Sequence, residues 1–323
     1  MYPLQNTTYP HTPIMVSQVL EFLDISKRKR IVDCTVGTGG HTEALLATSD
    51  SVDVLGIDRD PDALQIAGDR LAKYENRLKL YHGHFSDIEE ICRENNWDWI
   101  DGILLDAGLS SLQLDSPERG FSFRYSDAPL DMRMNKNDGI SAAELLNTID
   151  LKTLTKIFWK FGEEKHGRRL AQFILEAREL KPIETTGEFA KIILKAIPFA
   201  RGKIRSIQAR CFQALRIAVN DELEQLKSSL QATTKLLKPG GRIVILSFHS
   251  LEDRIVKKFF VEKAKNCTCP HGLPVCCCKT IPELKILTKN IVTASSEEIK
   301  KNSRAKPAKL RAAEKLPIEH KRI

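Results

Sequence analysis

Residues 32–42, Val-Asp-Cys-Thr-Val-Gly-Thr-Gly-Gly-His-Thr, constrain the fold of this 323-residue chain most. An apolar, β-branched segment runs directly into a glycine-rich turn, and a helical pattern follows. Glycine lets a backbone approach a ligand closely, and the first amides of a helix point toward that ligand. The pattern therefore predicts a strand, turn and helix at a sheet edge that binds a nucleotide or a related molecule.

The spacing of the glycines excludes two common versions of such a turn. A phosphate-binding P-loop needs a Lys after its last glycine, and none follows here. A dinucleotide fingerprint would begin with Gly37 and Gly39, but Thr42 stands where the third glycine should be. The glycine turn can therefore still bind a nucleoside, but its spacing does not fit a pyrophosphate.

Two further apolar runs end in an acidic residue. Asp58 follows the glycine turn by about 20 residues, the spacing at which a carboxylate can accept ribose hydroxyls, and Asp106 ends the next run. A single acid of this kind is usually a strand-end cap, but the three features in this order predict a nucleoside across the ends of parallel strands. Residues 236–260 add a Pro-Gly-Gly turn, a late strand and a helix opened by a predicted capping box of Ser250 and Asp253. This late segment resembles that of S-adenosylmethionine-dependent methyltransferases.

Composition and patterning set the wider frame. Hydrophobic residues make up 42% of the chain, enough for one large or two smaller domains. No apolar run reaches the ~18 residues of a membrane span, and residues 1–15 lack the order of a signal peptide, so we expect a cytoplasmic protein without membrane contact. Much of the formal charge of +8 lies in residues 299–323, with nine Lys or Arg against two Glu. This segment is either a polyanion-binding tail or a merely solvated one.

The pattern of elements changes along the chain. Strand and helix patterns alternate to about residue 114, which predicts an α/β fold with a parallel sheet. Residues 141–216 show helical spacing without strands, and one long helical pattern covers 207–237. We predict a Rossmann-like class I S-adenosylmethionine-dependent methyltransferase fold with an inserted helical domain. Its parts are 1–114, an insert at 115–216 for substrate recognition, and 217–323.

A loop at residues 110–134 mixes arginines with aromatic residues. Aromatic rings can stack on splayed bases while Arg binds phosphates or base edges. Aromatic residues at alternate positions also commonly face a protein core, so the spacing alone leaves both interpretations open.

The chain closely resembles the bacterial RsmH (MraW) family of small-subunit ribosomal RNA cytosine-N4 methyltransferases. The similar segments are 11–20, 32–42, 56–64, 102–134, 161–174, 212–223, 239–259 and 308–316. The most specific among them are Arg-Gly-Phe-Ser-Phe, Pro-Leu-Asp-Met-Arg-Met and Ser-Phe-His-Ser-Leu-Glu-Asp-Arg-Ile-Val-Lys. The resemblance implies methylation of a decoding-region cytidine of 16S rRNA, on the assembled small subunit.

The resemblance also implies roles for individual residues. Contacts with S-adenosylmethionine are expected from Gly39, Gly40, His41, Asp58, Phe85, Asp106 and Gln113. Candidates for RNA binding are Arg119, Phe121, Phe123, Arg124, Arg133, Arg210, Arg304 and Arg311.

The chain departs from the family pattern in two places. Residues 206–211 read Ser-Ile-Gln-Ala-Arg-Cys where the family usually has His-Pro-Ala-Thr-Arg-Thr, and 302–307 read Asn-Ser-Arg-Ala-Lys-Pro in place of Asn-Pro-Arg-x-Arg-Ser. Both lie outside the expected cofactor contacts, so we expect them to alter RNA affinity rather than the reaction.

The chemistry needs a polar group to accept an N–H of the cytosine amino group. Candidates are Asp131, Asp106 and His249, although Asp131 could instead form a turn with Arg133, and His249 could only support the start of a helix. The segment after Asp106 is not the Asp/Asn-Pro-Pro-Tyr/Phe turn of many amine methyltransferases. Methylation at C5 is disfavoured because that reaction uses a cysteine nucleophile, usually in a Pro-Cys pair. This chain contains no Pro-Cys pair.

Four clustered cysteines, Cys267, Cys269, Cys276 and Cys278, form two Cys-x-Cys pairs that could bind zinc, with His271 as a spare ligand. Reduced thiols in an accessory loop are the alternative. A non-catalytic assembly factor that binds RNA is a second hypothesis for the whole chain, and a methyltransferase acting on protein or a small molecule is a third. The sequence leaves the oligomeric state open, a homodimer included.

Overall fold

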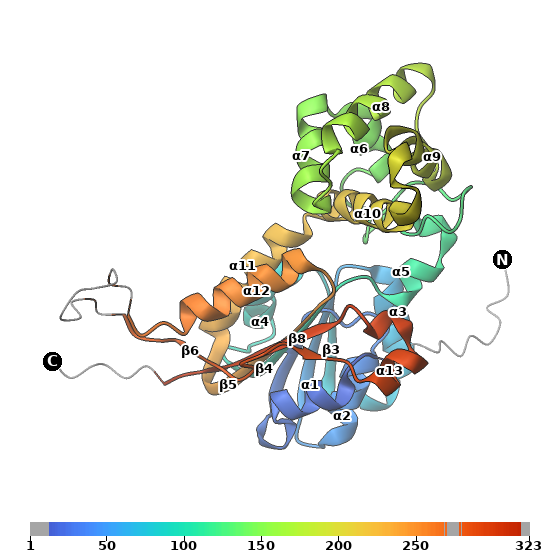
Figure 1. Cartoon of the computed structure of the whole chain (residues 1–323). Helices are drawn as coiled ribbons and strands as arrows, with labels where there is room; N and C mark the ends of the chain where they lie inside the picture. The colour runs from blue at the N-terminus through green and yellow to red at the C-terminus, as the bar shows by residue number, and fades with distance from the viewer. Residues whose placement is uncertain (1–12, 268, 270–277, 279, 318–323) are drawn as a thin grey trace. The chain divides into compact units, whose positions relative to one another are not determined.

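A computed structural model describes residues 13–267, 269, 278 and 280–317, without the side chains of residues 199–201. The chain forms two compact units (Figure 1). The sheet unit contains the described residues up to Gly108 and from Gln225 onward, and the helical unit spans Leu109–Glu224. The insert is therefore longer at both ends than the predicted 115–216.

The sheet unit is built on one mixed sheet. The strand order is β3-β2-β1-β4-β5-β8-β6, and β7 pairs with β8. The first five strands in this order are parallel, whereas β8 is antiparallel to β5, β6 and β7. The strands are β1 (Arg30–Asp33), β2 (Asp53–Asp58), β3 (Leu78–His82), β4 (Ile100–Ala107), β5 (Leu237–Ser247), β6 (Leu284–Ile286), β7 (Val292–Thr293) and β8 (Lys309–Lys315).

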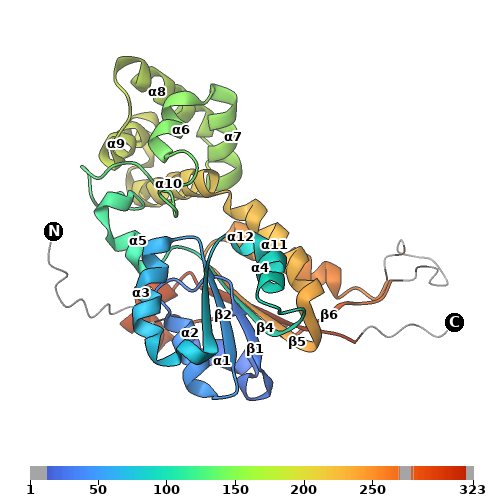
Figure 2. The same ribbon diagram turned by 180° about the vertical axis from the view of Figure 1, so that it is seen from behind.

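Helices cover both faces of this sheet, because alternate strand residues are apolar on both sides. Ile31 and Leu104 face one layer, and Val32 and Leu105 face the other. The first layer contains α1 (Val16–Leu23), α2 (Gly40–Thr48) and α13 (Ser296–Lys301), and the second contains α4 (Ile88–Glu94), α11 (Glu222–Leu236) and α12 (Ser250–Lys263) (Figures 1 and 2). Helix α3 (Pro61–Leu71) packs beside β3. This confirms the predicted Rossmann-like architecture.

The topology defines one edge of the sheet as the place for a ligand. Strand β1 lies between β2 and β4, so the chain proceeds to one side of β1 first and to the other side later. Such a switch point leaves a crevice outside the carboxyl ends of the two diverging strands, where ligands of open α/β sheets bind. The glycine turn at residues 37–40 follows β1 directly.

The basic C-terminal segment is not a solvated tail. Residues 309–315 form β8, which pairs with β5 on one side and with β6 and β7 on the other. Leu310, Ala312 and Ala313 are fully buried in this strand. The prediction of a tail was wrong for these residues because a count of charges conceals the apolar residues between them.

The helical unit has its own core. Phe158, Phe189 and Phe212 pack at its centre, with ring centroids 6.1 and 5.1 Å apart along this series. Its helices are α5 (Ser111–Asp115), α6 (Ala142–Thr148), α7 (Leu151–Gly162), α8 (Gly167–Leu180), α9 (Thr186–Ala196) and α10 (Ile204–Asn220). The long helical pattern predicted for 207–237 is interrupted, because Asp221 has a left-handed backbone with φ of 49° and ends α10. No helix in the described part of the chain is long and apolar enough to cross a membrane.

Candidate functional site

The turn after β1 requires glycine. Gly37 and Gly39 have φ values of 52° and 84°, which favour glycine over residues with a side chain. A Cβ atom on Gly39 would lie 2.9 Å from Leu71 Cδ1, and one on Gly40 would lie 3.1 Å from Pro13. The turn is thus packed on one side against α3 and the segment before α1. Gly40 begins α2, so the first amides of this helix lie at the turn.

Asp58 at the end of β2 is bound to this turn. Its Oδ2 accepts a hydrogen bond of 2.7 Å from the Gly37 N–H, and its Oδ1 accepts one of 2.9 Å from the Asp60 N–H. Burial raises the pKa of Asp58 to about 6, although these two N–H groups lower it. The carboxylate is therefore held in one orientation and is ionised at neutral pH, with lone pairs left to accept further donors.

Asp33 and Thr35 connect β1 to the neighbouring strands, and the sequence analysis missed both. The Thr42 hydroxyl donates to Asp33 Oδ2 at 2.7 Å, and the Thr35 N–H donates to Asp33 Oδ1 at 3.1 Å. The Asp106 N–H in turn donates to Thr35 Oγ1 at 2.7 Å, which fixes the end of β4 on the turn. An acid at the last position of β1, followed by Thr35 and by Thr42 in the first turn of α2, was the available signal.

Asp106 is the least satisfied acid of this edge. Its Oδ1 is buried and has no hydrogen-bond partner among the described residues, as is true of Thr38 Oγ1 in the glycine turn. Oδ2 lies 3.5 Å from His41 Nδ1, and the side chain is 25% exposed. Burial raises the pKa of Asp106 to about 6, against the attraction of His41, which lowers it.

The His41 ring has a defined direction. Nε2 lies 2.8 Å from the Ile14 carbonyl, which can only accept, so this nitrogen carries the proton. Nδ1 is the ring nitrogen that faces Asp106. Asp58, Asp106 and the glycine turn thus form one acidic cradle at the switch point, suited to a ligand that brings O–H or N–H donors or a positive charge.

Phe85 and Gln113 complete the predicted cofactor contacts. Phe85 follows β3 and packs, partly buried, against the sheet core. Gln113 belongs to the helical unit, where it is 4% exposed and its side chain accepts from the Ser110 N–H in a capping box. The role of each in cofactor binding stays a prediction.

His249 begins α12 as its N-cap. Its Nδ1 accepts from the Glu252 N–H at 3.3 Å, and its Nε2 lies 3.0 Å from Glu252 Oε1. Glu252 also accepts from the Phe248 N–H at 2.8 Å. The predicted capping box of Ser250 and Asp253 was therefore wrong by one residue. Both ring nitrogens of His249 lie near Glu252, but Nε2 has no hydrogen-bond partner among the described residues, so the catalytic role of His249 stays a prediction.

Asp131 in the helical unit is paired with Arg133. The Arg133 guanidinium donates two hydrogen bonds of 2.8 Å, from Nε to Asp131 Oδ1 and from Nη2 to Asp131 Oδ2. Burial tends to raise the pKa of Asp131, but the bonds from Arg133 lower it below the usual value of 3.8. Asp131 is thus an ionised, oriented carboxylate, and its catalytic role stays a prediction.

Several predicted RNA contacts are parts of the core instead. Arg119 is 2% exposed and donates to the Met134 carbonyl at 2.7 Å, and Phe121 is 7% exposed. Phe123 packs edge-on against Phe212 with ring centroids 5.3 Å apart. Arg311 is 8% exposed and binds Asp253 Oδ1 at 2.7 Å. For Arg119, Phe121 and Arg311 the structure corrects the prediction, because these buried side chains are occupied inside their own unit. Phe123 is partly buried, and its RNA contact stays a prediction.

Other basic candidates are accessible. Arg124 is exposed, Arg304 is half-buried, and Arg210 is 38% exposed while it binds the buried Glu164 at 2.6 Å. Arg133 is 23% exposed beside Asp131. Their RNA contacts stay predictions.

Three of the four predicted zinc ligands lie together. The sulfur atoms of Cys267, Cys269 and Cys278 are all within 4.8 Å of one another. Cys276 and the spare ligand His271 lie outside the described residues.

Several known proteins are similar to this chain. "Ribosomal RNA small subunit methyltransferase H" of Geobacter sulfurreducens is 49% identical over 96% of this chain and 100% of its own length. The proteins of the same name from Heliobacterium modesticaldum and Dehalococcoides mccartyi are 48% and 45% identical, over 95% and 96% of this chain and 99% and 88% of theirs. A solved rRNA methylase from Streptococcus thermophilus aligns over 94% of both chains with a TM-score of 0.41 and 12% identity. The model of the MraW methylase family matches residues 8–316, and the chain therefore belongs to that family.

Proposed function

We propose that this protein transfers a methyl group from S-adenosylmethionine to the N4 amino group of a decoding-region cytidine of 16S rRNA. The names of its relatives, each similar over nearly the whole chain, support an rRNA substrate. The observation that carries the proposal is the acidic cradle, in which Asp58 and Asp106 end two strands of the parallel sheet. Asp58 accepts from Gly37 of the glycine turn, and the Asp106 N–H donates to Thr35 just before that turn.

The cradle fits S-adenosylmethionine by its chemistry. Asp58 has the orientation and charge to accept two ribose hydroxyls, and the turn at 37–40 leaves backbone amides beside the methionine part. The unpartnered Oδ1 of Asp106 and Oγ1 of Thr38 are buried polar atoms that a bound ligand would satisfy. An acidic site also suits a cationic ligand.

The reaction asks little of the protein beyond alignment. When bound, S-adenosylmethionine supplies a methyl group attached to a positively charged sulfur. Because this charge disperses during the transfer, neither a metal ion nor a strong base is obligatory. Alignment of the reacting groups in a water-poor pocket can contribute roughly 7–11 kcal/mol.

The cytosine amino group needs an acceptor because its lone pair is drawn into the ring. We assign Asp106 this role, since its Oδ1 has no other described partner and its raised pKa makes it the better proton acceptor. Asp131, with its lowered pKa and two bonds from Arg133, suits orientation of the base rather than proton acceptance.

The test is nucleoside mass spectrometry after incubation of the protein and S-adenosylmethionine with unmethylated small subunits, and separately with naked 16S rRNA. We expect N4-methylcytidine on the subunits and none on the naked RNA. In the cell, we propose that the protein acts in the cytoplasm, where the subunits are assembled. Asp106→Asn should greatly reduce the product. The control is Asp53→Asn, which should not reduce it, because Asp53 is exposed and begins β2, at the end of that strand away from the cradle.

Each outcome has a meaning for the proposal. Product on naked RNA as well would show that the assembled subunit is not required. No methylated cytidine on either substrate, with cofactor binding intact, would favour the non-catalytic assembly factor. A homodimer stays a prediction, which sedimentation equilibrium of the same preparation checks.

A further inference from the structure

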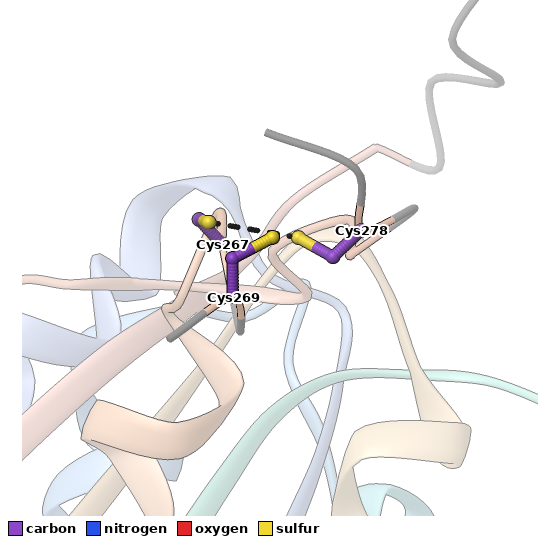
Figure 3. A group of neighbouring side chains, drawn as sticks. All are labelled: Cys267, Cys269 and Cys278. Carbon is purple, nitrogen blue, oxygen red and sulfur yellow. Dashed lines mark hydrogen bonds between the residues drawn. The ribbon is translucent and has the colours of Figure 1, made fainter. Parts of the chain in front are cut away.

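Three thiols converge on the segment between α12 and β6, outside the cradle. Cys267, Cys269 and Cys278 turn their sulfur atoms toward one another (Figure 3). Cys267 and Cys269 come from one side of the segment, and Cys278 comes from the other, 11 residues after Cys267. Nothing in the methyl transfer requires these thiols.

The spacing of the sulfur atoms is that of ligands around a metal ion. Cys267 Sγ and Cys278 Sγ lie 3.6 Å apart, far beyond the bond of about 2.05 Å that a disulfide between them would need. Zinc binds thiolates at about 2.3 Å in a tetrahedron, which puts neighbouring sulfur atoms about 3.8 Å apart. A grouping within 4.8 Å therefore needs little adjustment to surround one ion.

Hydrogen bonds and an ion pair already join the end of α12 to the start of β6. The Glu283 N–H donates to the Lys263 carbonyl at 2.8 Å, and Lys263 Nζ binds Glu283 Oε1 at 2.7 Å. The Leu316 N–H donates to the Glu283 carbonyl at 2.9 Å, which adds the end of β8. The end of α12 is thus joined to β6 and β8, and this preformed closure reduces the entropy that a ligand set further along the segment must overcome.

The closure lies at the edge of the sheet opposite the cradle. Leu284 pairs with Lys315, and Glu314 pairs with Arg242 near the amino end of the parallel part of β5. Asp58 and Asp106 lie at the carboxyl ends. An ion near this closure would act on the fold and not on the reacting groups.

We propose that Cys267, Cys269 and Cys278 bind one zinc ion that joins the described residues after α12 to those before β6. Three thiolates select a thiophilic ion such as Zn²⁺ over the oxygen-binding Mg²⁺ or Ca²⁺. Zinc replaces the thiol protons, so binding releases protons and weakens as the pH falls. The ion would hold the three-residue strand β6 on β8 and so protect the edge of the sheet.

The experiment measures zinc directly and does not depend on methyl transfer. The full chain is purified under reducing conditions without chelator, and zinc per chain is determined by plasma mass spectrometry. We expect about one zinc per chain for the wild type. Cys267→Ser, Cys269→Ser and Cys278→Ser should each lose most of the zinc. The matched control is Cys92→Ala, whose buried thiol in α4 cannot reach an ion.

A structural role predicts a second result. Removal of zinc by a chelator should lower the melting temperature of the wild type but not that of Cys267→Ser, and S-adenosylmethionine affinity should be unchanged in both. Wild-type protein without zinc after zinc reconstitution, or zinc retained by all three serine variants, would overturn the proposal. A chain found 2 Da lighter because Cys267 and Cys278 form a disulfide would overturn it also.

Discussion

The acids at the carboxyl edge of the sheet unit and Asp131 in the helical unit are held in opposite ways. At the carboxyl edge of the sheet unit, burial raises the pKa of Asp33, Asp58 and Asp106, and Asp106 Oδ1 has no described partner. In the helical unit Asp131 is paired with Arg133, and its pKa is lowered. The first arrangement is unfavourable without a ligand, whereas the second is satisfied by the protein alone.

This difference distinguishes a binding site from a structural network. A shift of the Asp106 pKa from 3.8 to about 6 corresponds to roughly 3 kcal/mol as an upper limit. The fold gains no stability from such a group, so its presence at this edge points to a ligand. Arg119 is also charged and buried, but its Nη2 donates to the Arg133 and Met134 carbonyls, so this group stabilises the helical unit itself.

The largest expected effect is on cofactor binding. Asp58→Ala removes the charged acceptor of the cradle, and two charge-assisted hydrogen bonds of about 1.5 kcal/mol each predict a loss of about 100-fold in S-adenosylmethionine affinity. Isothermal calorimetry measures it. Asp58→Asn, which can still accept from the Gly37 N–H, should lose less, and Asp53→Ala at the other end of β2 should bind like wild type. Unchanged affinity in Asp58→Ala would remove Asp58 from the site.

The next largest effect is expected for the stability of the helical unit when Arg119 is replaced. Arg119→Met breaks the bonds to the Arg133 and Met134 carbonyls, so we expect the free energy of unfolding to fall by about 2–3 kcal/mol. Urea unfolding measures the change. Arg124→Met, an exposed residue of the same loop, should stay within about 0.5 kcal/mol of wild type. A stable Arg119→Met with weakened RNA binding would restore Arg119 as an RNA contact.

Substitution of Asp106 should raise the free energy of unfolding, whereas substitution of Arg119 should lower it. Its folded pKa is above its unfolded one, so the folded state holds the proton more strongly, and the charged group costs stability once the pH rises from about 4 through about 6. Asp106→Asn removes this cost, so the apo variant should gain about 1–2 kcal/mol at pH 7.5 and nothing near pH 4. Urea unfolding at both pH values tests this. An equal gain at both would mean that the charge is not its source.

The sequence was informative where function depends on local chemistry. The glycine turn, Asp58 and Asp106 each follow an apolar run, and parallel strands bring their carboxyl ends to one edge. The same reasoning missed Thr35, because its hydroxyl meets the Asp106 N–H across 71 residues of sequence.

Long-range packing explains the other errors. The mixture of Arg and aromatic residues in 110–134 indicates a surface as readily as a core, and the partner of Phe123 is Phe212 on α10. Arg311 was counted as a tail charge because its partner, Asp253, lies 58 residues earlier. Neither partner can be inferred from spacing along the chain.

The smallest expected effect concerns the basic residues that remain exposed near the C-terminus. Because β8 belongs to the sheet, deletion of residues 299–323 would unfold it, and charge removal is the sharper test. Lys300, Lys301 and Lys306 are exposed, so replacing all three by Gln should leave stability unchanged and weaken RNA binding a few-fold. If each Lys neutralises one phosphate, the slope of log affinity against log salt should fall by about 2–3. An identical slope would mean that these lysines do not contact RNA.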